Sequence, residues 1–135
     1  MNQQEHRLQS ACVAWFRLQY PRKARLLFSI PNGATLAPAS GPGINHLPVG
    51  VRRAMAWKKL EQEGAVAGAA DLFLSIPSGD LCGLFIEMKT ATGRQSDKQK
   101  EFEADVLAEG YGYAMPRSVE EFMRVVRRYL ESGEY

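Results

Sequence analysis

The chain has 135 residues, with 17 Lys and Arg against 15 Asp and Glu, and 45% of its residues are hydrophobic. These values predict one ordinary globular domain over residues 1–135, and no apolar run approaches the ~18–20 residues of a membrane span. Two cysteines, Cys12 and Cys82, are too few for a disulfide framework or a four-cysteine zinc site. Because the N-terminus also lacks a signal-peptide pattern, we expect a cytoplasmic protein.

The charges are unevenly distributed along the chain. From His6 to Leu60 there are nine basic residues and no acid, whereas from Glu61 to Tyr135 there are 14 acids and eight bases. A long stretch without acids suggests a polyanionic partner such as nucleic acid, since phosphate binding is mainly electrostatic. The alternative is a solvated basic face without a ligand, and the charge pattern fits both.

The first half of the chain predicts a helix, a strand, a long loop and a second helix. Over residues 2–20 apolar side chains recur at helical spacing and predict an amphipathic helix that faces the core. Residues 26–30 are short and apolar, as in a strand. Residues 31–50 are rich in Pro, Gly, Asn and Ser and predict a loop, with a turn at Asn32-Gly33. A helix over residues 51–63 then ends at Gly64.

The second half predicts a β-hairpin, a helix, a strand and a last helix. The small residues of 64–70 favour a close approach of two backbones or leave room for a ligand. Strands at 71–76 and 81–89 are joined by a turn. Helices begin at Ser96 and Ser118, where Gln99 and Glu121 complete capping boxes, and a strand lies between them at 111–115. The order predicts an α/β fold with a mixed central sheet flanked by helices.

The strand that ends at Lys89 carries charges where a buried strand would be apolar. Side chains alternate across a strand, so Glu87 and Lys89 share the face opposite Ile86 and Met88. Buried charges are unfavourable unless they are paired or bind a metal. An ion pair between Glu87 and Lys89 is one explanation, and a functional site is the other.

Asp71 begins the partner strand of the hairpin and can lie beside Glu87. Two carboxylates on adjacent strands repel each other unless a cation lies between them, and Mg²⁺ prefers oxygen ligands. Asp71, Glu87 and a nearby lysine therefore outline a metal-assisted phosphodiester hydrolase. These residue types are common, so the spacing alone is a weak signal.

Ala70-Asp71, followed by Glu87-Met88-Lys89, resembles the PD-(D/E)xK nuclease motif. The surrounding sequence resembles the VRR-NUC branch of that superfamily more closely, and the likeness covers nearly the whole chain. Ala70 stands where the superfamily has proline, at a position that makes no metal bond. The matching segments are Ser29-Ile30-Pro31-Asn32-Gly33, Gly68-Ala69-Ala70-Asp71-Leu72-Phe73-Leu74, Gly83-Leu84-Phe85-Ile86-Glu87-Met88-Lys89, Gly93-Arg94-Gln95-Ser96 with Gln99, and Gly110-Tyr111.

The resemblance implies a restriction-endonuclease-like fold and a role for each motif residue. Asp71, Glu87 and the carbonyl of Met88 would bind Mg²⁺ or Mn²⁺, and Lys89 would be the catalytic lysine. Gln99 would face the site and orient lysine, water or phosphate, in addition to its capping role. Glu5 matches the acid that related nucleases contribute from an N-terminal helix. The alternative for Glu5 is a surface residue in the first turn of a helix, where an acid is favourable.

The implied activity is metal-dependent endonucleolytic cleavage of DNA by a stand-alone VRR-NUC protein of a bacterial cell or a phage-infected host. We expect a homodimer that acts on branched DNA such as a Holliday junction. The alternatives are a nuclease for flap, nicked or single-stranded DNA, and a DNA-binding module without catalysis. Trp57 is predicted to lie in the core. Candidate DNA contacts are Asn32, Arg52, Arg53, Lys58, Lys59 and Arg94.

Overall fold

The predicted order of helices and strands is confirmed, with one short 3₁₀ helix added after Pro21. The structure is a computed structural model that describes residues 2–32 and 36–135. Gly33 of the predicted turn therefore lies outside the described residues. The elements are α1 (Gln3–Gln19), η1 (Pro21–Leu26), β1 (Leu27–Ser29), α2 (Val49–Gln62), β2 (Leu72–Leu74), β3 (Leu84–Ile86), α3 (Asp97–Ala108), β4 (Gly112–Ala114) and α4 (Val119–Ser132).

The four strands form one mixed sheet in the order β1-β2-β3-β4. β1 and β3 each run antiparallel to β2, whereas β3 and β4 are parallel. The predicted hairpin is thus confirmed, although its two strands are shorter than the sequence suggests. Backbone pairing continues past the strand ends, where the Glu87 N–H donates to the Ala114 carbonyl at 2.9 Å and the Ile30 N–H donates to the Asp71 carbonyl at 2.8 Å.

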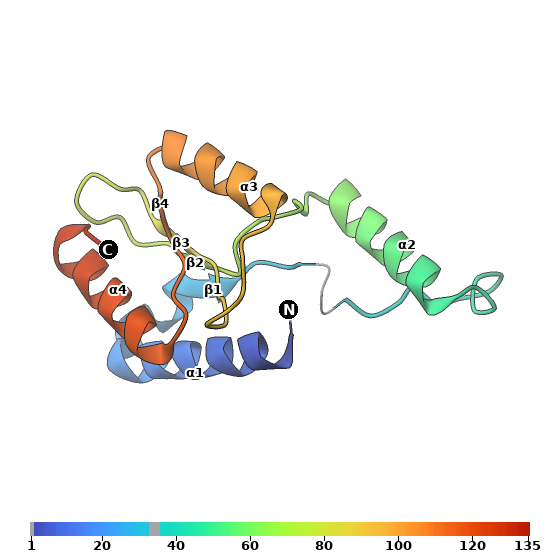
Figure 1. The fold of residues 1–135 in the computed structure, drawn as a ribbon, viewed down its shortest axis with the longest axis horizontal. Helices are drawn as coiled ribbons and strands as arrows, with labels where there is room; N and C mark the ends of the chain where they lie inside the picture. Colours follow the sequence, from blue (N-terminus) through green and yellow to red (C-terminus); the bar gives the residue numbers. More distant parts are fainter. Residues whose placement is uncertain (1, 33–35) are drawn as a thin grey trace.

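The hydrophobic core lies between the sheet and the pair of helices α1 and α4, which run along the same face in Figure 1. Inward side chains of the strands, including Leu72, Leu84 and Ile86, are completely or almost completely buried. Alternate residues of each strand supply this face, as the period of two requires. The core residues contributed by the two helices are Cys12, Phe16, Phe122, Val126 and Tyr129.

The opposite face of the sheet is aromatic and is covered by α3 in Figure 1. Phe73 and Phe85 lie next to each other on β2 and β3, with ring centroids 4.5 Å apart. Phe102 of α3 stands edge-on against Phe85 at 5.2 Å, which fixes the helix over the β3 side of the sheet. Phe28 of the edge strand β1 contacts Phe73 but remains 48% exposed.

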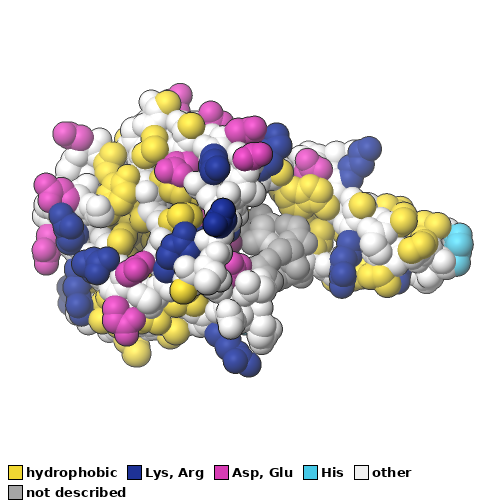
Figure 2. Space-filling model, in the orientation of Figure 1, with side chains coloured by type: hydrophobic (Ala, Val, Ile, Leu, Met, Phe, Trp, Pro, Cys, Tyr) yellow, Lys and Arg dark blue, Asp and Glu magenta, His cyan; other side chains and the backbone are white. Residues whose placement is uncertain are grey.

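α2 and the segment that precedes it form an arm that projects from the rest of the molecule (Figures 1 and 2). The Arg52 guanidinium fastens this segment to the helix, because it donates to the carbonyls of Leu47 and Ala39 at 3.2 Å each. No residue of α2 is fully buried. The prediction that Trp57 lies in the core is therefore wrong, since the arm leaves this helix without a sheet to pack against.

The predicted helix starts agree with the caps in the structure. At α3 the Ser96 hydroxyl accepts from the Gln99 N–H and the Gln99 side chain accepts from the Ser96 N–H, which completes the capping box. At α4 the Ser118 hydroxyl accepts from the Glu121 N–H, but the Glu121 carboxylate accepts from the Arg117 N–H instead. The second capping box thus differs from the standard form, because the Glu121 side chain accepts from the residue before the N-cap and not from the N-cap itself.

Within residues 2–32 and 36–135, no helix is both long and apolar enough to cross a membrane. Cys12 is buried and Cys82 is exposed, and both are free thiols.

Candidate active site

Asp71, Glu87 and Lys89 converge at one end of the hairpin, on the face of the sheet that carries α3. Asp71 directly precedes β2 and Glu87 directly follows β3. Because Leu72 pairs with Ile86 in the antiparallel register, the two carboxylates come to lie opposite each other. All three side chains are buried, with 7%, 3% and 8% of their surface exposed. The structure thus brings together the three residues of the nuclease-like motif.

Hydrogen bonds fix the orientation of the Asp71 carboxylate. The backbone N–H of Met88 donates to Asp71 Oδ2 at 2.7 Å, which ties the carboxylate of one strand to the backbone of the other. Asn32 Nδ2 donates to Asp71 Oδ1 at 3.4 Å. Asn32, predicted as a DNA contact, therefore lies in the site itself.

Glu87 is only half satisfied. Its Oε1 accepts a hydrogen bond from Gln99 Nε2 at 2.7 Å and lies 3.8 Å from Lys89 Nζ. Its Oε2 is buried and has no hydrogen-bond partner among the described residues. A buried oxygen without a partner is unfavourable, so this atom is suited to contact with a cation or with a shared proton.

Burial holds both carboxyl groups towards their neutral forms. Burial raises the pKa of Glu87 to about 8, repulsion by Asp71 adds to the increase, and Lys89 opposes it. Burial also raises the pKa of Asp71, against the effect of the Met88 N–H bond. Glu5 raises the pKa of both groups through its charge. The single ammonium of Lys89 therefore does not balance the burial of the two carboxyl groups, and a further positive charge would favour their ionised forms.

Gln99 combines the two roles that the sequence suggests, because its Oε1 caps α3 while its Nε2 holds Glu87. The start of α3 is placed by a close backbone approach at Gly68, which has a positive φ of 85°. A Cβ atom at this position would overlap the backbone of Lys98 and Gln99. The run of small residues thus serves close packing here.

Arg117 is a structural part of the site that the sequence analysis missed. Its Nη1 donates to the carbonyls of Thr90 at 2.7 Å and Gly93 at 2.6 Å. These contacts hold the loop that follows Lys89 against the start of α4. No motif marks Arg117, and its role depends on a loop that is distant in the sequence.

The other predicted residues are not part of this cluster. Among the described residues no group of three His, Cys, Asp or Glu side chains could hold a metal ion. Glu5 raises the pKa of Asp71 through its charge. Its role as a metal ligand stays a prediction. Arg53, Lys58 and Lys59 are exposed on α2, and Arg94 is exposed in the loop after Lys89. Arg52 holds the arm together. These DNA contacts stay predictions.

A cleft of about 400 Å³ opens beside the site and is bounded by the arm, β1 and α1. Asp71 and Asn32 line it, and His6, Gln9 and Leu60 are among its other lining residues. The cleft gives Asp71 a route to molecules larger than water.

Comparison with known proteins supports the resemblance seen in the sequence. No protein-family model and no curated protein matches the chain. A solved structure described as a "VRR_NUC domain protein" is similar to it with a TM-score of 0.74, covers 99% of this chain and 93% of its own, and shares 20% sequence identity. The residues that resemble the VRR-NUC motif thus lie on the fold of a solved VRR-NUC domain protein.

Proposed function

We propose that the protein is a metal-dependent endonuclease that hydrolyses phosphodiester bonds of DNA. The observation that carries the proposal is the half-satisfied Glu87, buried opposite Asp71 and beside Lys89. A purely structural ion pair would not need a second carboxylate at this place. A DNA-binding module without catalysis would not need two carboxylates facing a phosphate, because they would repel it.

The chemistry of the donor set fits Mg²⁺ or Mn²⁺. Asp71 and Glu87 supply carboxylate oxygens, the Met88 carbonyl is the predicted third ligand, and no soft ligand is present in the cluster. Mg²⁺ keeps several waters when it binds proteins, so few protein ligands are sufficient. A divalent cation would also complete the coordination of Glu87 Oε2 and reverse the rise in the pKa of both carboxyl groups.

The bound cation would supply positive charge at the scissile phosphate and make water more acidic. Lys89 adds an ammonium group close to Glu87, where it stabilises the negative charge that develops on the phosphate when water attacks phosphorus. Gln99 holds Glu87 in place, and Asn32 and the Met88 N–H orient Asp71. The burial of these groups strengthens each electrostatic contact.

For the substrate, we propose branched DNA such as a Holliday junction, cleaved by a homodimer. A cut in two strands needs two sites, which a symmetric dimer supplies. The projecting arm carries exposed Val49, Val51 and Met55 next to basic residues, which suits contact with a second copy or with DNA. Flap, nicked or single-stranded DNA is the alternative substrate class.

The test is a cleavage assay of purified protein on a labelled four-way junction, flap, nicked duplex, single strand and linear duplex. Each substrate is incubated with Mg²⁺, Mn²⁺ or chelator. We expect metal-dependent cleavage that is fastest on the junction, and light scattering should give twice the monomer mass. Absence of cleavage on every substrate with metal present would contradict the proposed activity.

Matched variants test the site. Asp71→Ala is compared with Asp80→Ala, and Lys89→Ala with Lys100→Ala, because Asp80 and Lys100 are exposed residues of the same types. We expect cleavage to be lost only in the first member of each pair. Wild-type rates in Asp71→Ala or Lys89→Ala would show that the site is assigned wrongly.

A further inference from the structure

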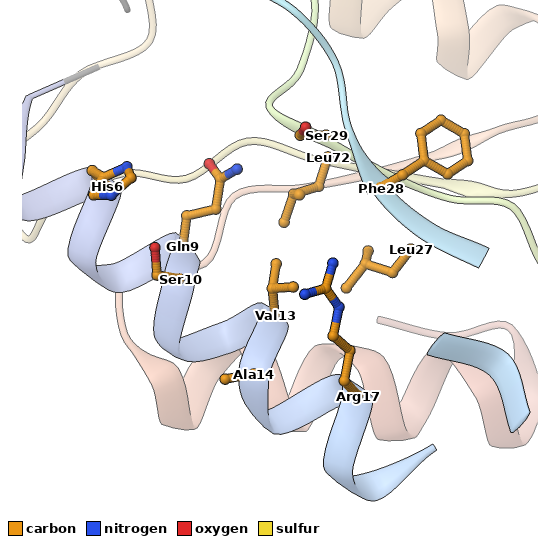
Figure 3. Close-up of a pocket in the computed structure, with 10 residues that line it drawn as sticks. All are labelled: His6, Gln9, Ser10, Val13, Ala14, Arg17, Leu27, Phe28, Ser29 and Leu72. Carbon is orange, nitrogen blue, oxygen red and sulfur yellow. The ribbon is translucent and has the colours of Figure 1, made fainter. Parts of the chain in front are cut away.

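A second groove leads away from the candidate active site along α1. It has a volume of about 310 Å³ and lies between this helix and the edge strand β1. In Figure 3 the side chains of Gln9, Val13 and Arg17 extend from α1 towards Leu72 and Leu27, and His6 lies at the far end of the row. These residues recur at helical spacing, so they form one stripe along the helix.

The chemistry of this stripe differs from that of an ordinary helix–sheet contact. The lining residues from α1 include the polar or basic His6, Gln9, Ser10 and Arg17, and the lining contains no acid. Within the described part of the chain, Arg17 makes no ion pair and no hydrogen bond through its side chain. A cation directed into an acid-free groove favours an anionic ligand.

Gln9 provides an independent indication that the groove suits a polar ligand. Its Oε1 is buried and has no hydrogen-bond partner among the described residues. An amide has an oxygen that accepts and a nitrogen that donates hydrogen bonds. By rotating its amide group, this side chain can present either atom to the groove. Gln9 as a whole is partly exposed, and its buried oxygen is unfavourable unless a ligand or water donates a hydrogen bond to it.

The groove adjoins the cleft at Asp71. His6, Gln9 and Ser29 line both cavities, so an extended ligand that passes these residues would contact both. From His6 to Arg17 the helix rises by about 16 Å. This is the axial length of about five successive phosphates in one strand of B-form DNA.

We infer that the groove between α1 and β1 binds the phosphates of the DNA strand on one side of the scissile bond. Arg17 contacts a phosphate directly, and Gln9 and His6 donate hydrogen bonds to the backbone closer to Asp71. This subsite rests on the proposed nuclease function, because it gives a direction to the strand that reaches Asp71. It gives a role to Arg17, one of the nine basic residues of the acid-free first part of the sequence.

The test measures DNA binding in chelator, where neither metal nor cleavage contributes. A labelled duplex with a single-stranded tail is titrated by fluorescence anisotropy between about 50 and 200 mM salt. In Arg17→Gln we expect affinity to fall several-fold. The slope of log affinity against log salt concentration should decrease by about one, which corresponds to the loss of one phosphate contact. Arg7→Gln is the matched control, because Arg7 is an exposed arginine of the same helix that does not line the groove. Equal affinities and salt slopes in the two variants would overturn the inference.

Gln9→Leu separates binding from folding. The change removes a buried unsatisfied oxygen, so we expect the melting temperature to rise while DNA affinity falls. Wild-type affinity in this variant would also overturn the inference.

A scan with single neutral methylphosphonate linkages locates the contact. One linkage should weaken binding to wild-type protein but not weaken binding to Arg17→Gln any further, since the two changes remove the same interaction. Additive losses at every linkage would contradict a direct contact. Selective loss of binding in Arg17→Gln without cleavage by wild-type protein would retain the groove and contradict the nuclease. Cleavage by wild-type protein, together with equal salt slopes in Arg17→Gln and Arg7→Gln, would support the nuclease and contradict the groove.

Discussion

The two faces of the central sheet use the same strands for opposite purposes. On the face covered by α1 and α4, Leu72, Ile86 and Met88 are buried among apolar side chains. On the face covered by α3, their chain neighbours Asp71 and Glu87 are buried almost as deeply but carry charge. Adjacent residues of the sequence therefore have opposite effects. Burial of the apolar residue stabilises the fold, whereas burial of its charged neighbour destabilises it.

The difference shows which buried side chains stabilise the fold and which destabilise it. Burial of each large apolar side chain stabilises the protein by about 1.5–3 kcal/mol. Burial of the two carboxyl groups has the opposite sign, because it raises the pKa of both. The apolar face therefore stabilises the structure throughout, whereas the α3 face combines the stabilising contacts of Phe73, Phe85 and Phe102 with a carboxyl pair whose burial is unfavourable.

The largest effect is expected when Glu87 is replaced by Gln. The amide keeps the shape of the side chain but cannot hold a divalent cation through two anionic oxygens, so we expect the cleavage rate to fall by at least about 10²–10³-fold. The same change removes a buried charge, so the metal-free protein should melt at a higher temperature above pH 8. Initial rates and thermal melts measure the two effects.

Glu101→Gln is the control for this change, because Glu101 is an exposed glutamate of α3. It should alter neither the rate nor the melting temperature. A Glu87→Gln protein that cleaves at the wild-type rate, or that melts at a lower temperature than wild type, would break the contrast between the two faces.

Replacing the adjacent Ile86 by Ala should give the reverse pattern. Ile86 is completely buried, so the cavity left behind should lower the free energy of unfolding by about 2–5 kcal/mol. The rate per folded molecule should change little, since the side chain points away from Glu87. Urea unfolding measures the first quantity, and Leu107→Ala, at a 45% exposed position, is the control for an apolar truncation without a cavity. Equal destabilisation by the two truncations would contradict this packing.

The pH dependence of stability follows from the raised carboxyl pKa values. The folded protein retains a proton on Glu87 up to about pH 8, whereas the unfolded chain loses it near 4.5. The folded state thus binds more protons between these values, and the stability of the metal-free protein should fall as pH rises through this window. Metal binding needs the ionised carboxylates, so the affinity for Mn²⁺ should rise over the same range. Thermal melts with Mn²⁺ or chelator measure both trends, and a metal-free stability that rises from pH 5 to 8 would contradict them.

A smaller effect is expected at Gly68, where the small-residue segment contacts the start of α3. Gly68→Ala adds a Cβ atom that overlaps the backbone of Lys98 in a left-handed conformation, so α3 must shift. We expect a loss of about 1–3 kcal/mol in stability and a slower cleavage rate, since Gln99 moves with the helix. Gly50→Ala is the control, because a Cβ atom there meets nothing within 4 Å inside α2 and should stabilise the helix by about 0.5–1 kcal/mol. Equal effects of the two substitutions would show that Gly68 does not position α3.

The charged face could be predicted from the sequence because its signals are local. The period of two places Glu87 and Lys89 opposite Ile86, and the tight hairpin turn brings Asp71 alongside. The capping box at Ser96 predicts where α3 starts, and the structure adds the second contact of Gln99 with Glu87.

The features that the sequence did not predict depend on contacts between distant segments. Arg117 binds carbonyls of a loop more than 20 residues earlier, and no local pattern encodes this. A lone Trp in a helix is most often a core residue, but α2, which carries Trp57, lies in an arm that no sheet covers. The absence of a hydrogen-bond partner for Glu87 Oε2 among the described residues also becomes apparent only when the positions of its neighbours are known.

The smallest effect compares two equivalent cap residues that serve the two faces. Gln99 and Glu121 each occupy the third position of a helix whose N-cap serine accepts from their backbone N–H. Replacing either by Ala should lower stability by about 0.5–2 kcal/mol through loss of a capping contact. Only Gln99 also touches Glu87, so only Gln99→Ala should reduce cleavage, by several-fold.

The Gln99→Glu variant isolates the second role of this side chain. Glutamate can still accept from the Ser96 N–H, so the cap of α3 is kept. It cannot donate to Glu87 when ionised, and a third carboxylate at this site adds repulsion, so metal-free stability should fall and cleavage should slow. The Glu121→Gln protein, measured in parallel, should cleave at the wild-type rate. Equal rates for Gln99→Glu and Glu121→Gln would show that Gln99 belongs with the residues that only build the fold.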